Sequence, residues 1–148
     1  AGGLELGRIN IAARGAGMAK GATNMALHYA MDRKTFGKAI AEHQAIQLKL
    51  AEMSTRAAAA ELLVHQAADK FDRCERCDLE AGQAKFFASE AAVQNSLDAM
   101  RVFGGYSYSP EYEIERFYRD APLLCIGEGT NEIQRNIVAE RVRGLPRG

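Results

Sequence analysis

The scarcity of proline is the feature that most constrains how this chain can fold. Only three of its 148 residues are proline, whereas alanine is abundant. Alanine has the highest helix propensity, and proline the lowest because it lacks an amide hydrogen and clashes with the preceding turn. The composition therefore predicts long helices, and no run of residues has a convincing strand pattern.

Apolar residues that recur every three or four positions mark four helical segments. One such stripe contains Ile46, Leu50, Met53, Ala57 and Val64. The predicted helices cover about residues 8–32, 42–72, 78–103 and 131–143. Four helices, three of them long, predict a single all-α domain over residues 1–148, built as an up-and-down four-helix bundle.

The connection over residues 104–130 is the longest of the three that join the predicted helices. We expect a short helix inside it, near residues 112–119. Connections longer than about 12–15 residues are uncommon in compact domains and are often functional. This segment is therefore the first place to look for a site.

Charge and composition exclude several classes of protein. Lys and Arg together number 19, as do Asp and Glu, so the basic excess of a general nucleic-acid-binding surface is absent. No stretch approaches the roughly 20 apolar residues that would span a membrane. An odd number of cysteines without a signal peptide favours a reducing intracellular location, either the cytoplasm or, in a eukaryote, the mitochondrial matrix.

Cys74 and Cys77 have the C-x-x-C spacing of some zinc ligands. Structural zinc sites usually need four ligands, and the chain has no second pair. We therefore expect two loop thiols and no metal site.

A single carboxylate, Glu128, stands between Gly127 and Gly129 just before the last predicted helix. Glycines allow a sharp bend and a close approach to a ligand. Thr130 or Asn131 can cap the following helix, whose N-terminus attracts anions. The motif predicts a carboxylate presented beside an anion-binding helix end, although a solvated glutamate in a capped loop also fits it.

The sequence Glu-Gly-Thr-Asn-Glu-Ile-Gln at residues 128–134 resembles a signature of the acyl-CoA dehydrogenase family, near its carboxy terminus. Three further segments resemble the family in the same order. They are Asp-Arg-Lys-Thr-Phe-Gly-Lys with the following His-Gln (32–44), Phe-Gly-Gly-Tyr (103–106) and Glu-Arg-Phe-Tyr-Arg-Asp-Ala (115–121). The matches extend over nearly the whole chain, so the resemblance to the family's carboxy-terminal helical domain is specific.

The resemblance implies that a carboxylate removes the α proton of an acyl-CoA thioester while the β hydrogen passes to FAD as hydride. Glu128 is then the base, its backbone N–H polarises the thioester carbonyl, and Arg8, Glu128 and Gly129 contact the substrate. Some family members carry the base on the first helix instead, at the position of Gly7, which supports Glu128 here. Arg8 is alternatively a surface residue of the first helical turn.

The resemblance also implies a set of cofactor-binding residues. Arg33 would contact the flavin pyrophosphate of a neighbouring subunit, with Phe36 packed on the cofactor and Gln44 bonded to it. A solvated Arg33 and a core Phe36 are the plain alternatives. The full expected set is Arg33, Phe36, Gln44, Arg101, Gly104, Gly105, Thr130 and Glu132.

Two positions depart from the family pattern. Arg101 replaces a glutamine that contacts the adenosine diphosphate part of the flavin, although arginine can still reach a phosphate. Gly127 replaces a tyrosine that walls the acyl pocket in many relatives. We expect the space left by Gly127 to suit a bulkier or branched acyl chain.

The family resemblance sets expectations for the whole enzyme. An amino-terminal helical domain and a middle β domain are expected outside residues 1–148, so the isolated chain should be inactive. The expected partners are an acyl-CoA, an electron-transferring flavoprotein, and further copies of the chain in a dimer or tetramer. The alternatives are an acyl-CoA oxidase and a non-catalytic oligomerisation module.

Overall fold

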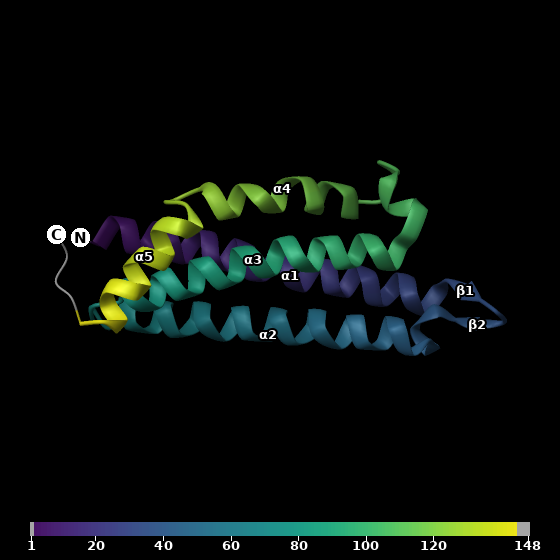
Figure 1. The fold of residues 1–148 in the computed structure, drawn as a ribbon, viewed down its shortest axis with the longest axis horizontal. Helices are drawn as coiled ribbons and strands as arrows, with labels where there is room; N and C mark the ends of the chain where they lie inside the picture. The colour runs from purple at the N-terminus through teal and green to yellow at the C-terminus, as the bar shows by residue number, and fades with distance from the viewer. Residues whose placement is uncertain (1, 145–148) are drawn as a thin grey trace.

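The computed structural model describes residues 2–144, which form a bundle of antiparallel helices (Figure 1). The four helices of the bundle are α1 (Gly2–Asp32), α2 (Gln44–Asp72), α3 (Asp78–Phe103) and α4 (Ile114–Ile126). The first three pack against one another, and α4 packs on α3 and α1. The predicted all-α, up-and-down four-helix bundle is confirmed.

The identity of the fourth helix differs from the prediction. The 3-10 helix η2 (Gly104–Tyr108) leads into α4, which is longer than the short helix expected near residues 112–119. Ile114, Ala121 and Leu124 form its buried face, although Pro122 lies inside it, a residue that usually breaks the helical pattern. The last predicted helix, α5 (Asn131–Val142), packs mainly on α3 and lies obliquely across one end of the bundle (Figure 1).

The connection between α1 and α2 contains two short strands that no pattern in the sequence indicated. Strands β1 (Lys34–Thr35) and β2 (Lys38–Ala39) pair in an antiparallel hairpin, which is followed by the 3-10 helix η1 (Ile40–Glu42). Phe36 and Gly37 at its tip both have positive φ angles, as in the tight turns that suit two-residue hairpins. Strands of two residues are too short to show an alternating pattern.

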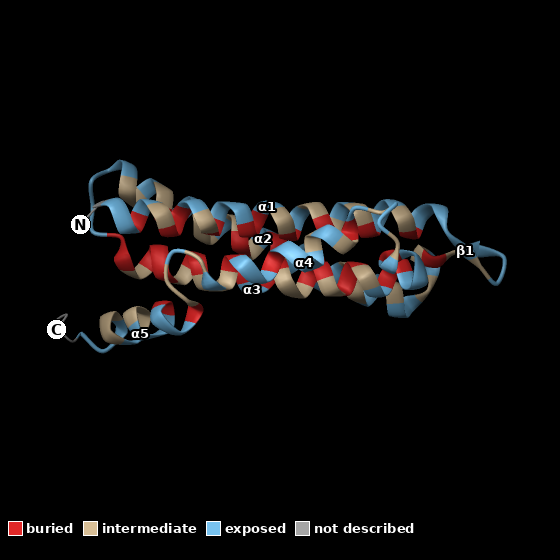
Figure 2. Ribbon diagram, turned by 90° about the horizontal axis from the view of Figure 1, so that it is seen from above, coloured by how far each residue is buried: buried red, intermediate tan, exposed pale blue. Residues whose placement is uncertain are grey.

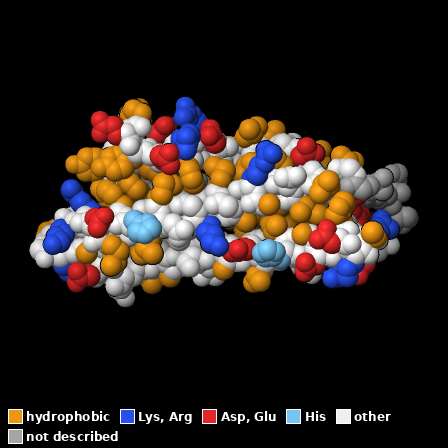
Figure 3. Space-filling model, turned by 180° about the vertical axis from the view of Figure 1, so that it is seen from behind, with side chains coloured by type: hydrophobic (Ala, Val, Ile, Leu, Met, Phe, Trp, Pro, Cys, Tyr) orange, Lys and Arg blue, Asp and Glu red, His pale blue; other side chains and the backbone are white. Residues whose placement is uncertain are grey.

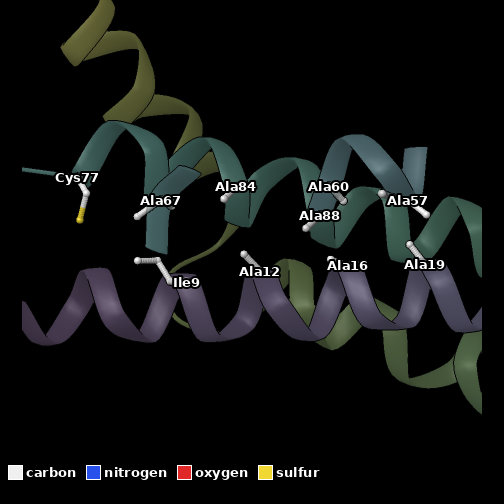
Figure 4. Packing of buried hydrophobic residues seen from close by; sticks show 12 residues of the cluster. Ile9, Ala12, Ala16, Ala19, Ala57, Ala60, Ala67, Cys77, Ala84 and Ala88 are labelled. Carbon is white, nitrogen blue, oxygen red and sulfur yellow. The ribbon is translucent and has the colours of Figure 1, made fainter. Parts of the chain in front are cut away.

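The first helix begins at Gly2 rather than near Arg8, where the apolar pattern begins. Most of its buried apolar residues are alanine, and Figure 4 shows the side chains of Ala12, Ala16 and Ala19 directed at α2 and α3. An added Cβ at Gly15 would lie 2.7 Å from the carbonyl oxygen of Ala88, so the backbones of α1 and α3 approach closely there. Small residues thus permit tight packing of the three long helices.

Burial follows the bundle axis (Figure 2), with most of the buried residues on the inner faces of α1 and α3. The face seen in Figure 3 carries charged side chains of both signs between apolar ones. Within residues 2–144, no helix is both long and apolar enough to cross a membrane.

Candidate active site

Glu128 lies on the four-residue loop that joins α4 to α5, and its side chain is exposed. Its φ angle is 56°, which is uncommon for a residue other than glycine, and that of Gly129 is 87°. The side-chain amide of Gln134 donates to the carbonyl oxygens of Glu128 (3.2 Å) and Gly129 (3.1 Å). The hydroxyl of Thr130 caps α5 by accepting from the backbone N–H of Ile133. Hydrogen bonds from Gln134 and the cap by Thr130 therefore fix the conformation of the loop, which is not a freely solvated turn.

The carboxylate of Glu128 lies directly against the first helix. A Cβ placed on Gly7 would be 2.5 Å from Glu128 Oε2, a contact that no real side chain could make without moving the carboxylate. Any larger residue at position 7 would displace Glu128 from this place. The absence of a side chain at Gly7 thus makes room for the glutamate that is the candidate base.

Arg8 is buried, with 7% of its surface exposed, so the alternative of a surface arginine is wrong. Its Nε and Nη1 atoms are buried without a hydrogen-bond partner among residues 2–144, and the same holds for Oε2 of Glu5. Buried polar atoms are nearly always bonded, and exceptions occur at sites that bind something else. Arg8 thus retains free donors near the end of the bundle that holds Glu128.

A second group of predicted residues lies at the opposite end of the bundle (Figure 1). Arg33, Gly104, Gly105 and Tyr106 line a hollow of about 480 Å³, and the Arg33 guanidinium lies 5.7 Å from the centre of the Tyr106 ring. Arg33 makes no ion pair with any carboxylate in the described part of the chain. A free guanidinium beside exposed glycine backbone suits a phosphate group.

Phe36 is 97% exposed at the tip of the hairpin, so it is not a core residue. Gln44, the first residue of α2, is also exposed at this end. Arg101 near the end of α3 is exposed but bonds Asp98 at 3.1 Å, so its guanidinium is already partly engaged. These three residues belong with Arg33 rather than with Glu128.

Thr130 and Glu132 belong to the Glu128 end. Glu132 is exposed and pairs with Arg135 at 3.3 Å. A hydrogen bond from its own backbone N–H, and then one from Thr130, hold the pKa of Glu132 below its usual value. The predicted site residues therefore form two groups that α1 separates by roughly 40 Å, at 1.5 Å per residue between Gly7 and Arg33.

Three residues near Glu128 were not predicted from the sequence as site residues: Lys85, Asn131 and Gln134. Lys85 is fully buried on α3, and its ammonium group donates to Cys125 O and Asn131 Oδ1. Burial lowers the pKa of Lys85. Gln134 closes the sequence motif and could have been noticed there, whereas a lone lysine in an alanine-rich helix gives no signal.

The cysteines are all free thiols. Cys74 is exposed, but Cys77 is buried as the N-cap residue of α3, so only one of the two expected loop thiols is accessible. Burial raises the pKa of Cys77. Among residues 2–144, no three His, Cys, Asp or Glu side chains are grouped so as to hold a metal ion.

The fold and these two ends define a helical domain that presents a carboxylate at one end and a phosphate-sized basic hollow at the other. The chain belongs to the acyl-CoA dehydrogenase family, because the family model described as "Acyl-CoA dehydrogenase, C-terminal domain" matches residues 1–143.

Individual relatives agree with this assignment. An acyl-CoA dehydrogenase of Bacillus subtilis is 50% identical over 141 residues, which cover 95% of this chain and 37% of the relative. The caffeyl-CoA reductase-Etf complex subunit CarC of Acetobacterium woodii is 42% identical over 136 residues, or 92% of this chain and 36% of the relative. The structure of butyryl-CoA dehydrogenase from Megasphaera elsdenii superimposes with a TM-score of 0.93 at 38% identity, covering 95% of this chain and 37% of that one. The chain thus spans little more than a third of these relatives.

Proposed function

We propose that this chain supplies the catalytic base and part of the flavin site of an FAD-dependent acyl-CoA dehydrogenase, which converts an acyl-CoA to a 2-enoyl-CoA. The observation that carries the proposal is the exposed carboxylate of Glu128, held on a left-handed loop against Gly7. A general base must be reachable by substrate and fixed in position, and this loop provides both.

In this proposal Glu128 accepts the α proton of the thioester. Its backbone N–H would donate to the developing charge on the thioester oxygen, which makes the α carbon more acidic. Arg8 uses its free donors to orient the base or the substrate. A Cβ on Gly127 would make only ordinary contacts, so nothing in this chain forces glycine there, which fits the idea that Gly127 leaves room for a bulky acyl chain.

The residues at the hairpin end fit the phosphates of FAD. Arg33, Phe36, Gln44, Arg101, Gly104 and Gly105 would hold the cofactor there, whereas Thr130 and Glu132 would approach a flavin bound beside Glu128. When bound, FAD accepts the β hydrogen as hydride. Because one copy cannot bring its two ends together, we propose that the sites are completed by a neighbouring copy in a homo-oligomer.

The electron acceptor and the direction of the reaction are separate proposals. One relative is named as part of a reductase-Etf complex, which supports an electron-transferring flavoprotein as the partner. It also favours a second candidate function, the reduction of a 2-enoyl-CoA by the same residues. An acyl-CoA oxidase differs only in passing electrons to oxygen, so peroxide formation would identify it.

The proposal is tested with Glu128→Gln in the native polypeptide that carries this sequence, purified with its flavin. Anaerobic acyl-CoA should bleach the flavin absorbance of the wild type, and the variant should do so at least about 100-fold more slowly, since general bases contribute 10²–10⁴-fold. Glu140→Gln, the same change on α5, is the control. Equal bleaching rates for the Glu128 variant and the wild type would refute the assignment of the base. A polypeptide without flavin would indicate a binding or assembly module.

A further inference from the structure

We propose that Lys85 is a positioning residue for Glu128. It bonds both the end of α4 and the start of α5, and the Glu128 loop connects these two helix ends. The proposal rests on the proposed function only in taking Glu128 as the base. The placement of the loop itself can be measured without substrate or flavin.

Lys85 lies in the middle of the contact between α3 and the α4–α5 corner, with none of its surface exposed. Its Nζ donates to the carbonyl oxygen of Cys125 at 3.0 Å and to Oδ1 of Asn131 at 2.8 Å. Cys125 is in the last turn of α4, where carbonyl groups lack partners within the helix. Asn131 is the first residue of α5. One ammonium group therefore joins the residues on either side of the Glu128 loop.

The orientation of Asn131 is fixed from its other side. Its amide nitrogen donates to Glu90 Oε1 at 2.8 Å and to the hydroxyl of Ser89 at 3.0 Å. Its oxygen is thereby directed at Lys85. Only 2% of Asn131 is exposed, so water does not replace these bonds. The start of α5 is therefore held on α3 by hydrogen bonds between Asn131 and three polar residues, Lys85, Ser89 and Glu90.

A buried lysine is costly, because burial disfavours its charged form. Lys85 donates hydrogen bonds to two neutral oxygens, and the end of α4 contributes the partial negative charge of a helix C-terminus. An apolar side chain would fill the same space at lower cost if packing were the only requirement. The lysine is best explained by its hydrogen bonds to Cys125 and Asn131, which an apolar side chain could not make.

Attachment of α5 to α3 does not require Lys85. Arg141 in the last turn of α5 forms an ion pair with Asp78 at 3.3 Å, and Val138 lies close to Gly82. These contacts lie toward the far end of α5, away from Glu128. The effect of Lys85 is thus local, and its loss would let the end of α4 and the start of α5 separate, which would shift Glu128 away from Gly7.

The test compares Lys85→Met with Lys70→Met. Lys70 donates to Glu80 at 2.6 Å between α2 and α3, so the control removes a tertiary lysine contact that does not touch the loop. Amide hydrogen exchange is measured at Gly127 and Gln134, whose N–H groups bond Leu123 O and Thr130 O at the two ends of the loop, and over the core of α1 and α3. Lys85→Met should speed loop exchange at least about tenfold relative to the core, whereas Lys70→Met should leave that ratio unchanged. Parallel acceleration of loop and core, or no change, would refute the proposal.

Ser89→Ala provides a milder variant in case Lys85→Met fails to fold. It removes the hydroxyl that accepts from Asn131 Nδ2 at 3.0 Å and donates to Asn131 Oδ1 at 3.1 Å, and it should speed loop exchange by a smaller factor with the core unaffected. In the flavin-containing polypeptide, Lys85→Met should also lower the flavin reduction rate per bound flavin about tenfold or more with little change in KM. A rise in KM with an unchanged rate of flavin reduction would contradict a positioning role. If the loop loosens but the wild type shows no dehydrogenase chemistry, the proposed function fails and the anchoring of the loop stands.

Discussion

The position of the candidate base depends on two glycines and one glutamine. Glu128 is held in a left-handed conformation that costs an ordinary residue on the order of 1–2 kcal/mol. Gln134 offsets that cost by bonding two carbonyl groups of the loop, and Gly129 is the residue that lets the chain turn toward it. The absence of a side chain at Gly7 completes the arrangement.

Gly129→Ala should destabilise the chain by about 1–3 kcal/mol. Its φ of 87° is strained for alanine, and the added Cβ would lie 2.9 Å from Gln134 Nε2. Urea unfolding of residues 1–148 measures the change. Gly17→Ala is the matched control on an exposed position of α1 with open space around it, and should be stabilising by roughly 0.5–1 kcal/mol. A neutral result for Gly129→Ala would mean that the loop relaxes freely.

At the scale of helices, α3 organises the bundle through two buried polar side chains. Asn95 donates to the carbonyl oxygens of Ala19 on α1 and Met53 on α2. Asp98, one turn later, bonds Arg56 and pairs with Lys49 of α2 at 3.5 Å. These contacts fix the register of the three long helices, which an alanine-rich interface alone would specify weakly.

Asp98→Asn should lower the free energy of unfolding by roughly 1–3 kcal/mol at neutral pH, since it weakens bonds to charged groups that remain partly hydrated. Burial alone would raise the pKa of Asp98, but hydrogen bonds from Gln94 and Arg56 and the charge of Lys49 hold it below 3.8. A carboxyl whose folded pKa is depressed stabilises the fold above its unfolded pKa and loses that effect as pH falls through the folded value.

The difference between wild type and Asp98→Asn should therefore be constant above about pH 5 and shrink below pH 3.8. Urea unfolding at a series of pH values measures it. Asp72→Asn, the same change at an exposed position on α2, should leave the pH dependence of the free energy of unfolding as it is in the wild type. A pH-independent difference would show that the charge of Asp98 contributes nothing.

At the scale of the whole molecule, the two groups of predicted site residues lie at opposite ends of a long bundle (Figure 1). The chain spans 37% of the Bacillus subtilis relative, and the Glu128 end exposes Leu123 and Ile126 beside the loop. In the proposed function, the base and the flavin-binding residues meet through other copies or other segments of the protein.

Residues 1–148 alone should fold into helices but show no acyl-CoA dehydrogenase turnover, because one copy cannot place a flavin against Glu128. Circular dichroism checks the fold, and dye reduction with mixed acyl-CoAs checks the activity. The flavin-containing native polypeptide is the positive control. Turnover by the isolated chain would contradict the proposal that Glu128 and the Arg33 group, at opposite ends of the bundle, need other copies or segments to complete the site.

The sequence by itself determined the helices, the bend at Glu128 and the family, because periodicity, glycine and short motifs act over neighbouring residues. It did not predict α4 at its full length, since Pro122 interrupts the pattern that tertiary packing nevertheless sustains. Only the tertiary structure decided that Arg8 and Lys85 are buried and that Arg33 lies far from Glu128. Burial and separation depend on contacts between residues distant in the chain, which no local pattern records.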